Sequence, residues 1–301
     1  MKCAAEPVRR AGISLALGVA LAMLSTSTTA RAWCRMTTSR RPPSFIGECV
    51  MEGIPLEWRR RCMSYAVDAR GARDLDDADV LRIVDVSFEA WLALDCGPGP
   101  RFEVRRESRR ARCDRAQYVQ DGGNVNVIAF VADWTERDHD PQAYALTTVW
   151  HHTRTGEIYD VDMEINEERG RYGVCPAPAG CTDGTIDLQN VITHEVGHFF
   201  GLAHSADRNA AMYGYSEPGE VDKRVLRGDD VEGFCAIYPS GALPEACDPT
   251  PRGGLDLDCT DASPSGCGCR AAGHGTWRLS GSVGLIALAA VIVRRRPRVR
   301  C

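Results

Sequence analysis

Apolar and polar residues alternate with two different periodicities along residues 54–240, one typical of helices and the other of strands. In residues 74–94 the apolar positions recur at three- and four-residue steps, which predicts a helix with one buried face. The aspartates at its start suit the positive end of the helix dipole. Partial alternation, with many β-branched and aromatic residues, predicts strands over 61–69, 125–134, 143–152 and 157–166. The order of strand, helix, several strands and a further helix is typical of an α+β domain.

The start of the chain breaks this pattern. A basic stretch comes first, then an apolar run, and then the small-x-small site Ala30-Arg31-Ala32. This order predicts a signal peptide over residues 1–32, removed before Trp33, in preference to a buried N-terminal helix. A polar N-terminal segment, residues 33–53, then precedes the domain at 54–240.

The C-terminal part also departs from a globular pattern. Residues 241–269 are rich in Gly, Pro, Asp and Cys and end in GCGC, which predicts a linker or tether. Residues 270–301 contain an apolar run at 279–293, too short for an ordinary span of about 20 residues, and then an arginine cluster. This order is typical of a sorting signal, and it resembles the myxobacterial C-terminal tail called MYXO-CTERM. The resemblance implies export, cleavage near the Cys motif and attachment to the cell surface.

Charge narrows the classes of partner. The formal net charge of the chain is −5, but residues 33–269 hold 25 of the 36 basic and 40 of the 41 acidic residues, a net charge of −15. Such a surface repels nucleic acid and anionic lipid. The predicted partner is a protein or peptide substrate, with membrane or cell-surface attachment through the C-terminal tail alone. The oligomeric state stays open.

Ten of the fourteen cysteines lie between the two end segments. An even number in an exported chain predicts disulfides, and the lack of a C-x-x-C pair among the ten argues against structural zinc sites. Cys175 with Cys181, and Cys247 with Cys259, are close enough in sequence to close small loops, although spacing does not determine the pairing. The ten are Cys34, Cys49, Cys62, Cys96, Cys113, Cys175, Cys181, Cys235, Cys247 and Cys259.

Three of the seven histidines fall within THEVGHFFGLAHS at 193–205. On a helix, His194 and His198 are four residues apart and point at the same place, so they provide two ligands of a tetrahedral zinc site. Gly201 tolerates the positive φ that ends a helix, which lets the chain turn back and bring His204 to the metal. The alternative is that these histidines only pack against or cap a core helix.

Glu195 follows the first of these histidines and points along the expected cleft rather than at the metal. A carboxylate in that position takes a proton from the attacking water and passes it to the leaving amine. The pattern therefore predicts metal-assisted hydrolysis of amide bonds.

The residues His194, Glu195, His198, Gly201 and His204 match the metzincin signature H-E-x-x-H-x-x-G-x-x-H. Met212 lies where that clan has its Met-turn, and Ser205 resembles the matrixin branch. The segment GDDVEGFCAIYP at 228–239 is similar to the final helix of the matrixins, and it also has the pattern of an ordinary helix capped by aspartate.

The resemblance implies a zinc endopeptidase in a metzincin fold. It places an extended substrate antiparallel to the edge strand, which is one of the strands between 143 and 166, and places Met212 beneath the zinc, with ordinary core packing as the alternative. The chain departs from animal matrixins in two ways. No P-R-C-G cysteine switch precedes residue 190, and the H-x-D pattern of the structural zinc site is missing, leaving only His139, His151 and His152 for it.

The sequence also leaves open whether acidic residues form a calcium site. Asp160, Asp162 and Glu164 alternate along one face of a predicted strand, so they either bind Ca²⁺ or form a solvated acidic face, which is the interpretation we favour. The same two interpretations apply to the acids of the linker, Asp256, Asp258 and Asp261.

These observations predict an exported, surface-anchored, matrixin-like zinc endopeptidase. Zinc is expected on His194, His198 and His204, with Glu195 as general base and acid. The alternative is a surface binding or adhesion module that keeps the zinc fold without turnover, and the presence of Glu195 argues against it because the ligands alone hold a metal. A third hypothesis is a zinc hydrolase of cell-wall cross-links.

Overall fold

The computed structural model describes residues 31–239 and 241–260. The predicted signal peptide up to residue 30, and the GCGC motif with the predicted sorting tail, lie outside these ranges. Across the residues that are described, none of the helices combines the length and the apolar character needed to cross a bilayer.

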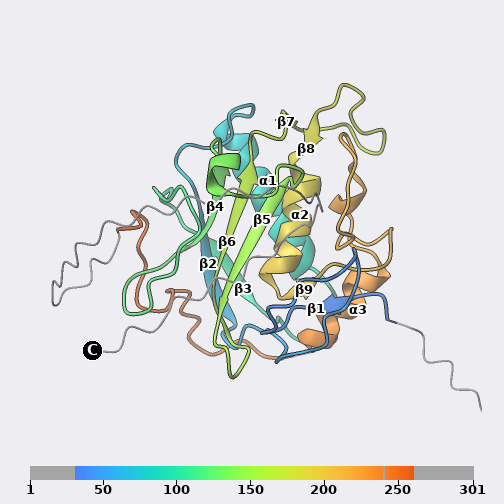
Figure 1. The fold of residues 1–301 in the computed structure, drawn as a ribbon. Helices are drawn as coiled ribbons and strands as arrows, with labels where there is room; N and C mark the ends of the chain where they lie inside the picture. Colours follow the sequence, from blue (N-terminus) through green and yellow to red (C-terminus); the bar gives the residue numbers. More distant parts are fainter. Residues whose placement is uncertain (1–30, 240, 261–301) are drawn as a thin grey trace, which may run out of the picture. The chain divides into compact units, whose positions relative to one another are not determined.

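A five-stranded sheet with the strand order β3-β2-β4-β6-β5 lies at the centre of the fold (Figure 1). Strands β3, β2, β4 and β6 run parallel to their neighbours, whereas β5 runs antiparallel to β6 and forms one edge. The strands are β2 (Cys62–Val67), β3 (Glu103–Arg106), β4 (Asn126–Val131), β5 (Ala145–His151) and β6 (Ile158–Asn166). Four of them confirm the predicted strands; β3 was not predicted because its sequence, EVRR, has no apolar alternation.

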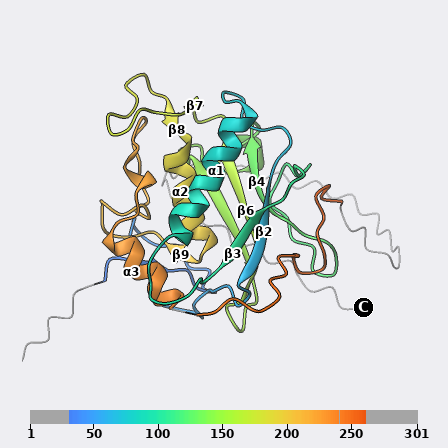
Figure 2. The ribbon, with the colours of Figure 1, turned by 180° about the vertical axis from the view of Figure 1, so that it is seen from behind.

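Two helices cover one face of this sheet, which we call the inner face (Figure 2). Helix α1 (Asp77–Leu92) begins after Asp76 and helix α2 (Leu188–Phe199) after Asp187, and each aspartate accepts a hydrogen bond from the backbone N–H three residues on. The indole of Trp91 in α1 donates to the carbonyl oxygen of Thr193 in α2 at 2.8 Å, so the two helices are joined by a buried hydrogen bond as well as by apolar packing. The predicted α+β architecture is therefore confirmed.

Short elements complete the fold around these layers. Strand β1 pairs antiparallel with β9, which places the N-terminal segment beside the turn that follows α2. The last helix confirms the helix predicted in GDDVEGFCAIYP. The elements are β1 (Cys34–Arg35), η1 (Thr135–Arg137), β7 (Tyr172–Gly173), β8 (Ile186–Asp187), β9 (Leu202–Ala203), η2 (Asp222–Arg224) and α3 (Gly228–Ile237).

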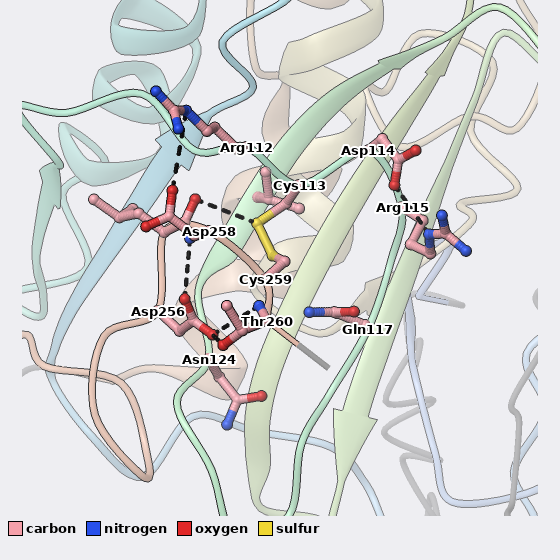
Figure 3. Close-up of a disulfide and its surroundings, with 12 residues drawn as sticks. Arg112, Cys113, Asp114, Arg115, Gln117, Asn124, Asp256, Asp258, Cys259 and Thr260 are labelled. Atoms are coloured by element: carbon pink, nitrogen blue, oxygen red, sulfur yellow. Dashed lines mark hydrogen bonds and ion pairs between the residues drawn. A yellow bond between two sulfur atoms is a disulfide. The ribbon is translucent and has the colours of Figure 1, made fainter. Parts of the chain in front are cut away.

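The outer face of the sheet carries a C-terminal strap, residues 247–259, whose two ends are fixed by the disulfides Cys62–Cys247 and Cys113–Cys259. Figure 3 shows the second of these disulfides with Arg112 and Asp258 beside it. Leu257 of the strap packs into a small second core formed by Ala66, Ala111, Val125 and Val127.

Two expectations for this region are therefore wrong. Cys247 and Cys259 do not pair with each other, and the described part of the expected tether is bound along the sheet because it meets partners far away in the sequence. The pairing of Cys175 with Cys181 is confirmed. The two remaining disulfides, Cys34–Cys49 and Cys96–Cys235, bring the total within the described residues to five.

Candidate metal centre

The three histidines of the sequence motif meet at the C-terminal end of α2. His194 and His198 lie one turn apart on this helix, with ring centroids 4.9 Å from each other. Gly201 follows with a φ of +83°, and its N–H bonds to the carbonyl oxygen of His198 at 2.9 Å, so the helix ends and the chain reverses. His204 then comes within 5.2 Å of His194 and 5.0 Å of His198, measured between ring centroids. One ligand atom from each of the three lies within 4.8 Å of the others.

Backbone carbonyls orient two of these imidazoles. Nδ1 of His194 lies 2.6 Å from the carbonyl oxygen of Ala211, and Nδ1 of His198 lies 2.8 Å from that of Leu202. With Nδ1 as the donor in both rings, each Nε2 presents its lone pair to the centre of the cluster. The arrangement suits a cation that prefers imidazole nitrogen.

Burial keeps the rings of His194 and His204 neutral. It lowers the pKa of His194 well below its usual value and lowers the pKa of His204 to about 3, and in both cases the nearby Lys223 and His198 charges act in the same direction. Neutral imidazole is the form that binds a metal. His194 and His204 are therefore ready to bind a metal at neutral pH without first losing a proton.

Glu195 lies between α2 and the edge strand. Its side chain is 6% exposed, and its Oε2 accepts a hydrogen bond of 2.5 Å from the hydroxyl of Thr147 in β5. Burial raises the pKa of Glu195, and the His198 charge and the Thr147 hydroxyl oppose that rise. A raised pKa brings a carboxylate closer to neutral pH, where it can both accept and donate a proton.

Met212 lies beneath α2. A Cβ added at Gly197 would come 2.1 Å from its sulfur atom, so the helix needs glycine at this point to approach the methionine. Asp230 in α3 fixes the turn, because its two carboxylate oxygens accept hydrogen bonds from the N–H groups of Ala211 and Met212 at 2.9 and 3.0 Å. The neighbouring Asp229 accepts from the hydroxyl of Ser205 and from the N–H of Trp33.

Two residues of this region were missed by sequence reasoning. Thr147 is an ordinary polar residue of a predicted strand, and only the packing of β5 against α2 brings it to Glu195. Lys223 lies in η2, is 5% exposed, and donates from Nζ to the carbonyl oxygen of Tyr213, while burial lowers its pKa to about 8. The 3.6-residue period could not reveal it, because η2 is a single turn.

The other predicted metal residues do not join the cluster. Within residues 31–239 and 241–260, the only set of three or more metal-ligand side chains close together is His194, His198 and His204. His139 lies instead 3.5 Å from Glu164, measured from Nε2 to Oε2. The solvated acidic face expected for β6 is wrong: Asp160, Asp162 and Glu164 are 0%, 0% and 3% exposed, because residues 113–127 and the loop after β4 pack over them.

Comparisons with known proteins agree with this geometry. Residues 130–239 match the family model described as Matrixin. The chain is 26% identical over 217 residues to neutrophil collagenase of Homo sapiens, an alignment that covers 69% of this chain and 40% of that protein. It is 41% identical over 183 residues to metalloendoproteinase 1-MMP of Arabidopsis thaliana (60% and 44%), and 42% identical over 215 residues to interstitial collagenase of Sus scrofa (67% and 39%). The chain thus spans less than half the length of these relatives.

Proposed function

We propose that this chain is a zinc metalloendopeptidase that hydrolyses peptide bonds outside the cell. The match of residues 130–239 to the Matrixin model and the similarity to metalloendoproteinases support this proposal. One observation carries the proposal. Three imidazoles converge on one point, and the buried carboxylate of Glu195 projects from the helix that carries two of them. A purely structural metal site takes a fourth protein ligand, whereas a catalytic site keeps that position open.

The residues fit zinc. Three imidazole nitrogens within 4.8 Å of one another suit a tetrahedral site with one open position, and the carbonyl oxygens behind His194 and His198 hold the rings in the required orientation. When bound, zinc supplies Lewis acidity, which polarises the scissile carbonyl and makes a water molecule more acidic.

Glu195 is proposed as the general base and then the general acid. Its hydrogen bond from Thr147 holds one carboxylate oxygen, which leaves the other to receive a proton from the attacking water and deliver it to the leaving nitrogen. The raised pKa of Glu195 supports this double role, because the carboxyl group must release the proton again in the same cycle.

Strand β5 is proposed to bind the substrate backbone. It is the antiparallel edge of the sheet, and the hydrogen bond from Thr147 to Glu195 places it beside the histidine cluster. An extended peptide added to this edge forms main-chain hydrogen bonds with little dependence on sequence. The sequence left the edge strand open between residues 143 and 166, and the proposal takes β5 because it is an edge of the sheet. Met212 is proposed to support the site from below.

Export and surface attachment belong to the same proposal. Five disulfides are typical of a protein that folds in an oxidising compartment. The predicted signal peptide and sorting tail would take the chain there and attach it to the cell surface.

The test compares the wild type with Glu195→Ala in hydrolysis of a mixed quenched-peptide library, with zinc content measured in both proteins. We expect equal zinc and a loss of kcat/KM of about 10²–10⁴-fold in the variant, the range for removal of a general acid–base group. Zinc in both proteins without cleavage by either would favour the non-catalytic binding module or a substrate other than a simple peptide.

A further inference from the structure

Residues 34–57 connect the turn after α2 to the hairpin formed by β5 and β6. At one end, β1 pairs with β9, and the N–H of Met36 bonds to the carbonyl oxygen of Gly201 at 2.9 Å. At the other end, the N–H of Glu57 bonds to the carbonyl oxygen of Gly156 at 3.0 Å. Figure 1 shows this segment, in blue, below α2 and beside the turn between β5 and β6. The segment therefore lies at the C-terminal end of β5.

Four large apolar side chains are exposed within ten residues of this segment. They are Phe45, Ile46, Met51 and Ile54, which are 66%, 43%, 82% and 38% exposed. We call residues 45–54 the apolar loop. Single exposed apolar side chains are ordinary, whereas a cluster of them marks an interaction surface. The apolar loop is therefore a candidate binding surface.

The first part of the apolar loop lies against the histidine turn. A Cβ added at Gly47 would come 2.6 Å from Cα of Ala206, which is two residues after His204. The disulfide Cys34–Cys49 closes this part of the segment and holds the loop in place. The first two apolar residues of the loop directly precede this contact, so they lie close to the turn that carries the third histidine.

The last part of the apolar loop lies at the turn between β5 and β6. A Cβ added at Gly156 would come 3.2 Å from Cγ2 of Ile54. The charged side chains of the loop, Glu48 and Glu52, pair with Arg41 at 2.8 and 3.4 Å. The loop thus extends from the histidine turn to the hairpin turn, and what it offers to a partner is mainly apolar.

The direction of β5 determines which part of a substrate reaches the apolar loop. Strand β5 runs from Ala145 to His151, so a peptide paired antiparallel with it has its N-terminal part beside His151. Thr147, which bonds to Glu195, marks the level of the scissile bond. The end of β5 is four residues further on, about 14 Å at the rise of an antiparallel strand. Substrate residues about four or more positions before the scissile bond therefore meet the loop.

We propose that the apolar loop binds apolar side chains of the polypeptide substrate, about four or more residues before the scissile bond. This inference rests on the proposed peptidase function and names a substrate class for it. A polypeptide is the occupant because the loop continues the β5 edge at the end where the substrate leaves it. The loop is remote from the reacting atoms, so it contributes to binding the substrate and not to the chemical step.

The experiment uses the zinc-loaded full chain and three quenched peptides with identical residues around the scissile bond. The first peptide begins three residues before the bond and is too short to reach the loop, so it gives the reference rate. The second carries four additional Ser and Gly residues at its N-terminus, and the third carries four additional residues that include Leu and Phe. We expect kcat/KM for the third peptide to exceed that for the second by about fivefold to thirtyfold, mainly through KM, as for partial burial of one or two apolar side chains.

The double variant Phe45→Ser with Ile46→Ser should abolish the difference between the second and third peptides. Leu255→Ser is the matched control, because Leu255 is 41% exposed, close to the 43% of Ile46, but lies in the strap on the outer face. The control should keep the difference. Equal kcat/KM for the second and third peptides in the wild type overturns the inference, as does a double variant that still distinguishes them.

A binding measurement separates this inference from the proposed peptidase function. Fluorescence anisotropy of the labelled second and third peptides with the Glu195→Ala protein measures the preference without turnover. The third peptide should bind more tightly, and adding the two serine substitutions should remove its advantage. Equal Kd values overturn the inference whether or not the wild type cleaves any peptide. Weaker binding of the double variant to phosphatidylcholine vesicles, with the peptide preference unchanged, would also overturn it and assign the loop to a lipid surface.

Discussion

On the inner face of the sheet, the buried imidazoles of His194 and His198 each have a backbone carbonyl that fixes the ring. On the outer face, the carboxylate of Asp160 has no hydrogen-bond partner among the described residues. The inner site is built from one helix and the turn after it. The outer region is built from β6, residues 113–127 and a strap that joins the sheet from more than a hundred residues away. Local spacing thus produces the first arrangement, and long-range covalent bonds support the second.

Removing the disulfide Cys113–Cys259 should have the largest effect that distinguishes the outer face from the inner face. Replacing both cysteines by serine frees the end of the strap and should lower the free energy of unfolding by about 2–5 kcal/mol, because the bridge spans 146 residues. Zinc content at the histidines should stay unchanged. The measurement is denaturant unfolding alongside metal analysis. Cys175→Ser with Cys181→Ser, which opens a separation of only 6 residues, is the matched control and should cost less.

A substitution on the inner face tests the packing below the histidines. In Gly197→Ala the new Cβ would come 2.1 Å from the sulfur of Met212 and 2.8 Å from the ring of Trp91, so Met212 has to move. We expect a destabilisation of about 1–3 kcal/mol, as for other overpacked cores, together with reduced peptide hydrolysis. Gly228→Ala, where no atom lies within 4 Å of the added Cβ, is the control, and equal Tm shifts in the two variants would contradict the packing argument.

The pH dependence of stability probes the outer face. Burial raises the pKa of Asp162 to about 8, although the N–H groups of Val127 and Gln117 lower it, and burial with the Asp162 charge raises that of Asp160. The folded protein therefore binds a proton that the unfolded chain has lost. The contribution of this titration to stability should be greatest below about pH 4 and fall by about 1 kcal/mol per pH unit up to about pH 8.

This pH effect is isolated by comparing urea unfolding of the wild type and Asp162→Asn between those pH values. The difference between the two curves should shrink as the pH falls. A constant difference would mean that Asp162 does not titrate in this range.

The smallest expected effect concerns the hydrogen bond to Glu195. Thr147→Val removes the hydroxyl and keeps the shape of the side chain, so the loss in kcat/KM should be about threefold to tenfold, corresponding to one hydrogen bond of about 1 kcal/mol. Steady-state kinetics with a peptide substrate measure it. Thr148→Val, on the next residue of β5, is the control; a loss as large as that of Glu195→Ala would show that Thr147 has a greater role than orientation.

The sequence predicted most of the inner face because its signals are local. The four-residue spacing of His194 and His198, the glycine before the turn and the apolar period of α1 all act within a few residues. The outer face was predicted poorly for the opposite reason. A row of alternating acids looks the same whether water or protein covers it. The cover comes from residues 113–127 and the loop after β4, and their contacts with β6 are long-range.

The long disulfides also determine what happens when the chain is cut. Three of them, Cys62–Cys247, Cys96–Cys235 and Cys113–Cys259, join residues before 114 to residues after 234. A cut anywhere between these limits, for example in the loop after β4 or the loop before β8, leaves two pieces connected by three covalent bonds. A chain cut once in this interval therefore keeps its fragments together, and such molecules would appear whole on a gel until a reductant is added.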